Sequence, residues 1–144
     1  MSVEKNRREA QRWFETAEGD LITADVLLTN HRYAHACFHS QQCGEKAIKA
    51  LWYLLDADPW GHSIKRLLQA LESVDLRMFT QLKDLEKSAI ILDRFYITTR
   101  YPNGLPDLTP EEAYLEEDAK SCIEHAKKII SSVSSILLAP EFNR

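Results

Sequence analysis

The sequence predicts an all-α fold, an up-and-down bundle of four long helices plus one short helix. Apolar residues recur at intervals of three and four over most of the 144 residues, as in amphipathic helices. No segment alternates apolar and polar residues over the length of a strand. The chain length fits one domain, and 44% hydrophobic with 28% charged residues is typical of globular proteins. We therefore expect residues 1–144 to form a single domain.

The first predicted helix covers residues 3–29. Its core face is an apolar series with helical spacing: Trp13, Ala17, Leu21, Ala24 and Leu28. Asn30 marks the end, because asparagine tolerates the left-handed conformation that often follows a helix.

The second predicted helix covers residues 33–56 and combines a wide apolar arc with one polar edge. The arc contains Tyr33, Cys37, Phe38, Gly44, Ala47, Ile48, Leu51, Trp52, Leu54 and Leu55. The polar edge contains Arg32, His35, His39, Gln42, Lys46 and Lys49.

The segment "DADPWGHS" interrupts the helical pattern, and a short third helix follows it. The core positions of this helix are Ile64, Leu67, Leu68 and Leu71. A fourth helix is predicted over residues 76–93, with these residues inside: Phe79, Leu82, Leu85, Ala89 and Leu92.

Residues 92–113 form the one long irregular segment, and the last helix begins at its end. The run Pro-Asn-Gly favours a turn with Gly104 at positive φ. Thr109, Pro110 and Glu112 make a capping box with proline at the first helical position. The seam of the last helix is predicted to contain Leu115, Ala119, Cys122, Ala126, Ile129, Val133 and Ile136.

Charge and composition exclude several classes of protein. A net charge of −4 excludes a broadly basic nucleic-acid binder, so nucleic-acid contact would need a local basic patch. Three cysteines without metal-ligand spacing indicate reduced thiols in a cytoplasmic protein. The sequence contains no signal peptide and no apolar run of membrane-spanning length. We therefore expect a cytoplasmic protein without a membrane partner.

Metal, cofactor and common enzyme motifs are absent. His31, His35 and His39 have helical spacing, and His62 follows, but no acidic residue lies among the first three. A catalytic zinc site needs a third ligand and usually a carboxylate base, so we expect no metal. Walker, GxGxxG and GxSxG motifs do not occur, and we expect no cofactor.

Two polar residues lie at the shoulder of the apolar arc of the second helix. Gln41 and Glu45 follow Phe38 at helical spacing, and buried polar groups need partners. We expect both to be structural anchors, although a direct ligand role stays open. As an anchor, Glu45 could hold an arginine from elsewhere in the bundle. Glu45/Lys49 and Gln42/Lys46 are spaced for pairing along the helix.

Arginine and tyrosine concentrate in "RFYITTRY". Arg94 and Arg100 could bind phosphate, and Tyr96 and Tyr101 could stack on a base. The same residues could instead fasten a long loop to the bundle, and the chemistry alone favours neither reading. If the site binds a nucleotide or RNA, the second helix could contribute two more basic residues, Lys46 and Lys49.

Four segments together resemble the HEPN family over about residues 12–132. They are "AHACFHSQQCGEKAIKAL", "GHSIKRLL", "LDRFYITTRYPNGLP" and the last helix with "AKKII". The resemblance implies a bundle of four to five helices, a homodimer, and a minimal nucleotidyltransferase as partner in a toxin–antitoxin or defence system. Several family members are metal-independent ribonucleases that carry an Arg-x4–6-His motif, in which arginine orients the phosphate and histidine assists attack by the ribose 2′-hydroxyl.

The chain departs from this ribonuclease motif, because "FYITTRY" follows Arg94 and contains no histidine. Loss of the imidazole removes an acid–base step that is typically worth about 10²–10⁴-fold in rate. We therefore expect a protein that binds nucleotide or RNA phosphate rather than an enzyme. Two alternatives are a ribonuclease that uses Tyr96 or His39 for proton transfer, and a purely structural dimerisation module.

Overall fold

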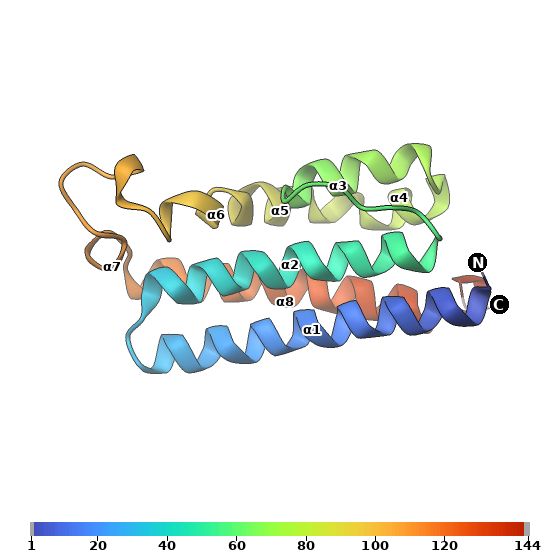
Figure 1. Cartoon of the computed structure of the whole chain (residues 1–144), viewed down its shortest axis with the longest axis horizontal. Coiled ribbons are helices and arrows are strands. Elements are labelled where there is room, and N and C mark those ends of the chain that lie inside the picture. The colour runs from blue at the N-terminus through green and yellow to red at the C-terminus, as the bar shows by residue number, and fades with distance from the viewer. Residues whose placement is uncertain (1, 143–144) are drawn as a thin grey trace.

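The computed structural model describes residues 2–142, and the predicted all-α class is confirmed in them. Three long helices lie along the bundle: α1 (Val3–Thr29), α2 (Tyr33–Leu54) and α8 (Glu116–Leu138). In Figure 1, a row of shorter helices lies along the opposite side of α2 from α1. This row contains α3 (Ile64–Ala70), α4 (Leu76–Leu82), α5 (Glu86–Asp93) and α6 (Phe95–Thr98). Helix α7 (Pro110–Ala113) precedes α8.

Helices α1 and α2 form a hairpin whose turn differs in one residue from the prediction. Helix α1 begins after Ser2, whose side chain accepts a hydrogen bond from the Lys5 N–H. At the other end, the left-handed residue is His31, with φ 61°, and not Asn30, with φ −95°. The Arg32 N–H donates to the Leu27 carbonyl at 2.8 Å and closes the turn. Helix α1 itself has the predicted bounds.

Helix α2 is the central element, since it contacts α1, α3, α5, α6 and α8. Gly44 lies where α3, α5 and α8 meet α2. A Cβ atom at this position would lie 2.8 Å from Ile64 Cδ1, 3.0 Å from Ile129 Cδ1 and 3.3 Å from Leu92 Cδ1. The glycine therefore allows α3, α5 and α8 to pack against one point of α2.

The fourth predicted helix is divided into α4, the 3₁₀ segment Lys83–Leu85 and α5. A 3₁₀ turn places residues three apart on the same side. Leu82 and Leu85, which are 1% and 5% exposed, both face the core as a result. The apolar spacing of residues 76–93 therefore predicted Leu82, Leu85, Ala89 and Leu92 in the core, but it missed the break and the buried Met78, and Phe79 is only half-buried.

Residues 92–113 contain more regular structure than predicted. Helix α6 and a 3₁₀ turn at Pro102–Gly104 occupy part of the segment. Gly104 lies in that turn rather than at positive φ, and the left-handed residue is Asp107, with φ 58°. The prediction for Gly104 was wrong because the run Pro-Asn-Gly forms a helical turn instead of a type II turn.

The capping box at Thr109 is present, but the helix that it starts is only α7. The chain becomes extended at Tyr114 and Leu115 before α8 begins. This break lets the Tyr114 ring pack against Phe95 at 5.6 Å, while its hydroxyl donates to Thr98. Leu115 is consequently 59% exposed and does not belong to the seam, whereas the other predicted seam residues of α8 are buried.

The core is one continuous apolar cluster built mainly from α2, α3, α5 and α8. All three cysteines are free and buried in it. A hydrogen bond with Cys37 and burial raise the pKa of the Cys122 thiol, so that this thiol stays protonated and unreactive. Among residues 2–142, no helix combines the length and apolar character needed to cross a membrane.

Candidate functional site

Asp93, at the end of α5, fastens the start of α3. Its carboxylate accepts hydrogen bonds from the Ser63 hydroxyl at 2.8 Å and from the N–H groups of Ile64 at 2.9 Å and Lys65 at 3.1 Å. These groups belong to the first turn of α3, where N–H groups lack partners within the helix. The contact brings the "GHSIKRLL" and "LDRFYITTRY" segments together, so that residues from both face α2.

Beside this junction, α2 contributes three polar residues to a buried network. The Gln41 amide donates to the His62 carbonyl at 3.0 Å. The Glu45 carboxylate, whose side chain is 5% exposed, accepts from Lys49 Nζ at 3.0 Å and meets His62 Nδ1 at 3.3 Å. The partners of Glu45 are therefore Lys49, at the spacing noted in the sequence, and His62, in place of an arginine from elsewhere in the bundle. Gln41 and Glu45 both hold the loop that precedes α3.

This network continues into α6 through aromatic contacts. The His62 ring stacks on Tyr96, with centroids 5.1 Å apart and an angle of 18° between planes. The Arg100 guanidinium carbon lies 4.4 Å from the Tyr96 centroid, 4.7 Å from Phe38 and 5.2 Å from Tyr101. We call this set the α6-side cluster: Phe38, Gln41, Glu45, Lys49, His62, Tyr96, Arg100 and Tyr101.

Arg100 is held by rings rather than by acids. Its Nε–H donates to the Tyr96 carbonyl at 2.9 Å, which fixes the plane of the guanidinium. No carboxylate among residues 2–142 forms an ion pair with Arg100. The two terminal nitrogens therefore keep donors for a ligand, and a planar guanidinium binds an oxyanion such as phosphate through two parallel hydrogen bonds.

Arg94 lies apart from Arg100. It is exposed on the outer face of α5, where it borders a shallow depression of about 480 Å³ with Glu86, Lys87, Ile90 and Ile91. The structure brings Arg100, Tyr96 and Tyr101 together and leaves Arg94 on a neighbouring surface.

Lys46 belongs to a second polar group, on the other flank of α2. Lys46 Nζ lies 2.8 Å and His39 Nδ1 3.4 Å from the carboxylate of Asp20 on α1. We call these three residues the α1-side cluster. Burial alone would raise the pKa of Asp20, but the hydrogen bonds from His39 and Lys46 outweigh it and lower that pKa. Lys46 therefore pairs with α1 rather than with Gln42, which instead bonds Gln41 and Glu45.

The remaining predicted histidines each have a polar partner. His31 Nδ1 lies 2.9 Å from the Tyr33 hydroxyl, and His35 Nε2 lies 3.2 Å from Glu111. Arg32 also pairs with Glu111, at 3.1 Å, which fastens α7 to the start of α2. Within the part of the chain that the structure describes, no three His, Cys, Asp or Glu side chains are grouped to hold a metal ion.

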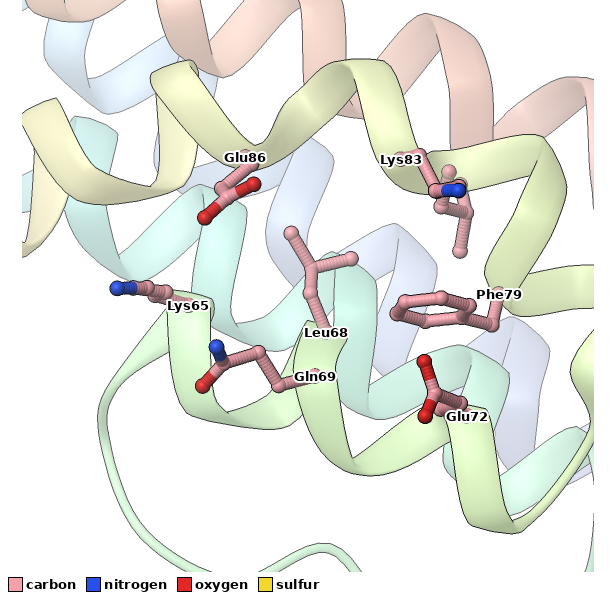
Figure 2. Close-up of a pocket in the computed structure, with 8 residues that line it drawn as sticks. Lys65, Leu68, Gln69, Glu72, Phe79, Lys83 and Glu86 are labelled. Carbon is pink, nitrogen blue, oxygen red and sulfur yellow. The ribbon is translucent and has the colours of Figure 1, made fainter.

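A separate groove of about 260 Å³ lies between α3 and the segment α4–α5. Figure 2 shows Leu68 and the Phe79 ring inside it, with the charged side chains of Lys65, Glu72, Lys83 and Glu86 around them. None of the predicted site residues lines it. Because its charges are of both signs and exposed, it offers no concentrated potential for a phosphate.

Sequence reasoning missed the place of His62 in this site. The sequence offered His62 only as a possible metal ligand. In the structure, its ring lies between the Glu45 carboxylate and the Tyr96 ring. One signal was available: Gln41 and Glu45 are polar residues on a buried arc, and such residues require partners from another segment.

Comparisons with known proteins match these features. A family model described as the HEPN domain matches residues 10–136. "Putative toxin MJ1304" of Methanocaldococcus jannaschii is 28% identical over 137 residues, which cover 92% of this chain and 90% of that protein.

Solved structures are similar over nearly the whole chain. The crystal structure of TT1696 from Thermus thermophilus has 37% identity and a TM-score of 0.80, covering 88% of this chain and 97% of that one. ST0689, described as an archaeal HEPN homologue, has 34% identity and a TM-score of 0.73, with 90% and 98% covered. A HEPN domain protein of Thermotoga maritima, TM0613, has 31% identity and a TM-score of 0.67, with 88% and 97% covered.

Proposed function

The chain belongs to the HEPN family, and on that premise we propose that it binds the phosphate of a nucleotide or of RNA at Arg100. The observation that carries this proposal is the environment of the Arg100 side chain. Three aromatic rings and one backbone carbonyl hold the guanidinium, and no described carboxylate neutralises it. An immobilised cation loses little conformational entropy when it binds an anion, so the site is preorganised.

The other predicted site residues contribute to binding to different extents in this proposal. Tyr101 is 50% exposed and offers a ring face for a base beside the phosphate. Tyr96 positions Arg100, and exposed Arg94 offers a second cation on the neighbouring surface. Lys46 and Lys49 contribute less, because each already has a carboxylate partner at 3.0 Å or nearer.

The proposal includes a biological setting. We propose a cytoplasmic homodimer that acts with a minimal nucleotidyltransferase in a toxin–antitoxin or defence system. Similarity to a protein named as a toxin supports this setting. We propose binding without ribonuclease chemistry, because no histidine follows Arg94 at the spacing of the ribonuclease motif.

A binding titration tests the proposal. Fluorescence anisotropy with a labelled single-stranded oligoribonucleotide would compare wild type, Arg100→Ala and Arg77→Ala. Arg77 is an exposed arginine on α4 and serves as the charge-matched control. A hydrogen bond to a charged group is worth about 1.5–3 kcal/mol, so we expect Arg100→Ala to bind about 10- to 100-fold more weakly. Equal affinity of Arg100→Ala and wild type would refute the assignment.

A further inference from the structure

We propose that a cavity between the start of α1 and the end of α2 binds an alkylammonium ion. Figure 1 shows these two helix ends at the right of the bundle, whereas α6 and α7 lie at the left, so the cavity is remote from α6. The cavity measures about 220 Å³ and is lined by Asn6, Glu9, Tyr53, Asp56, Ala57 and Asp58. The inference does not depend on the proposed function, because it concerns another site and a ligand of opposite charge.

Carboxylates line this cavity, and no basic residue is among the lining residues. Asp58 is exposed and forms no ion pair with any residue among 2–142. Glu9 accepts hydrogen bonds from Arg12 at 2.7 Å and from the Trp13 indole at 3.2 Å. The Arg12 side chain is 77% exposed and lies outside the lining of the cavity. These contacts therefore leave the charge of Asp58 unbalanced.

The Tyr53 side chain lies in the electric field of these carboxylates. Burial, followed by the charges of Asp58 and Glu9, raises the pKa of the Tyr53 hydroxyl above its ordinary value of 10.0. A field that disfavours a phenolate favours a cation at the same place. The ring is also held in position, because it stacks on Trp13 with centroids 5.0 Å apart and an angle of 26° between the planes. An aromatic ring beside carboxylates attracts an ammonium ion through the negative charge of its face.

Asn6 provides a second, independent indication of a ligand. This residue is 8% exposed, and its side-chain amide forms no hydrogen bond with any residue among 2–142. In the same part of the chain, every fully buried side-chain nitrogen or oxygen has a partner. The Asn6 amide atoms therefore keep their small accessible area at the cavity that the residue lines. A buried amide without a partner costs free energy, and an ammonium donor would satisfy its oxygen.

The arrangement of these acceptors suits an organic cation better than a metal ion. Among the described residues, no three His, Cys, Asp or Glu side chains are grouped closely enough to hold a metal. An ammonium has three N–H donors that point in different directions, whereas a guanidinium donates within one plane. The acceptors come from α1 and from the loop after α2, so they approach a ligand from separate directions. A free polyamine and the lysine side chain of a partner protein both carry an alkylammonium group.

Isothermal titration calorimetry with two probes, spermidine and N-acetyl-lysine methylamide, tests the site. We expect wild type to bind at one site per chain. A hydrogen bond to a charged group is typically worth about 10-fold or more in affinity, so Asn6→Ala should weaken binding by at least that factor. Asp58→Asn removes one exposed charge, and we expect binding about 3- to 5-fold weaker. Urea unfolding of both variants verifies that they are folded.

Glu72→Gln is the matched control, because it removes one exposed carboxylate from the separate groove between α3 and the segment α4–α5. This variant should bind as wild type does. Binding of spermidine alone identifies a free polyamine as the ligand, whereas binding of the lysine probe identifies the side chain of a partner protein. The proposal is overturned if wild type binds neither probe, if Asn6→Ala or Asp58→Asn binds as tightly as wild type, or if Glu72→Gln weakens binding as much as Asp58→Asn does.

Discussion

The two flanks of α2 carry the same kinds of side chain and differ in how their charges are balanced. On the α1 side, Asp20 accepts from both Lys46 and His39. On the α6 side, Glu45 accepts from Lys49 and His62, and a further cation, Arg100, lies on aromatic rings. In the α1-side cluster, Asp20 is the carboxylate partner of both basic residues. In the α6-side cluster, Arg100 has no carboxylate partner among the described residues. The comparison teaches that an unbalanced charge, rather than polarity alone, distinguishes the flank where we propose a ligand site.

The largest expected effect comes from breaking the buried pair on the α6 side. Glu45→Ala leaves Lys49, whose side chain is 11% exposed, without a counter-charge. Removing one partner of a buried ion pair typically costs about 3–5 kcal/mol. We expect the free energy of unfolding, measured by urea denaturation, to fall by about this amount.

The control for this variant is Glu116→Ala. This change removes an ion pair between Glu116 and Lys120 on the surface of α8, where their side chains are 51% and 62% exposed. Such a pair contributes less than about 1 kcal/mol. If both variants lose equal stability, Glu45 is not the buried anchor that the structure places beneath His62.

A smaller effect, on pH dependence, is expected on the α1 side. Burial opposes ionisation of Asp20, but hydrogen bonds from His39 and Lys46 lower its pKa in the folded state below the ordinary value of 3.8. A lowered carboxyl pKa stabilises the fold at pH values above the unfolded pKa. This stabilisation is lost as the pH falls through the lower, folded pKa.

The measurement is urea unfolding of wild type and Asp20→Asn between pH 6 and pH 2. We expect wild type to be the more stable protein at pH 6, with the difference shrinking below pH 3.8. Lys46→Ala removes one of the two partners and should give an intermediate profile. Parallel curves for wild type and Asp20→Asn would show that Asp20 is not held by these cations.

Local features of the sequence predicted most of the fold. The bounds of α1 and the capping box at Thr109 followed from spacing and cap residues, which act within a few positions. The break at Tyr114 was missed, because it depends on a contact with Phe95 on another helix. Propensity describes a segment in isolation, and tertiary packing overrides it at such points.

The sequence predicted only part of how the side chains of the candidate site are grouped. Tyr96, Arg100 and Tyr101 are neighbours in sequence, so their association followed from the pattern "RFYITTRY". Asp20, the partner of Lys46, and His62, the second partner of Glu45, lie far away in the chain, and their pairing depends on which flank of α2 faces which helix. Helical spacing shows which residues share a flank of α2, but it does not show which other segment packs against that flank. The contact of His62 with Glu45 was missed for this reason.

The smallest expected effect sharpens the comparison between the flanks. In Lys46→Ala, we expect oligoribonucleotide affinity to stay within about twofold of wild type, because Asp20 already balances the charge of this half-buried lysine. The anisotropy titration used for Arg100→Ala provides the measurement. If Lys46→Ala instead weakens binding as strongly as Arg100→Ala, the ligand must cross both flanks, and ion pairing with Asp20 does not remove Lys46 from the site. Asp20→Ala then distinguishes the two arrangements, since it releases Lys46 and should tighten binding only where the lysine faces the ligand.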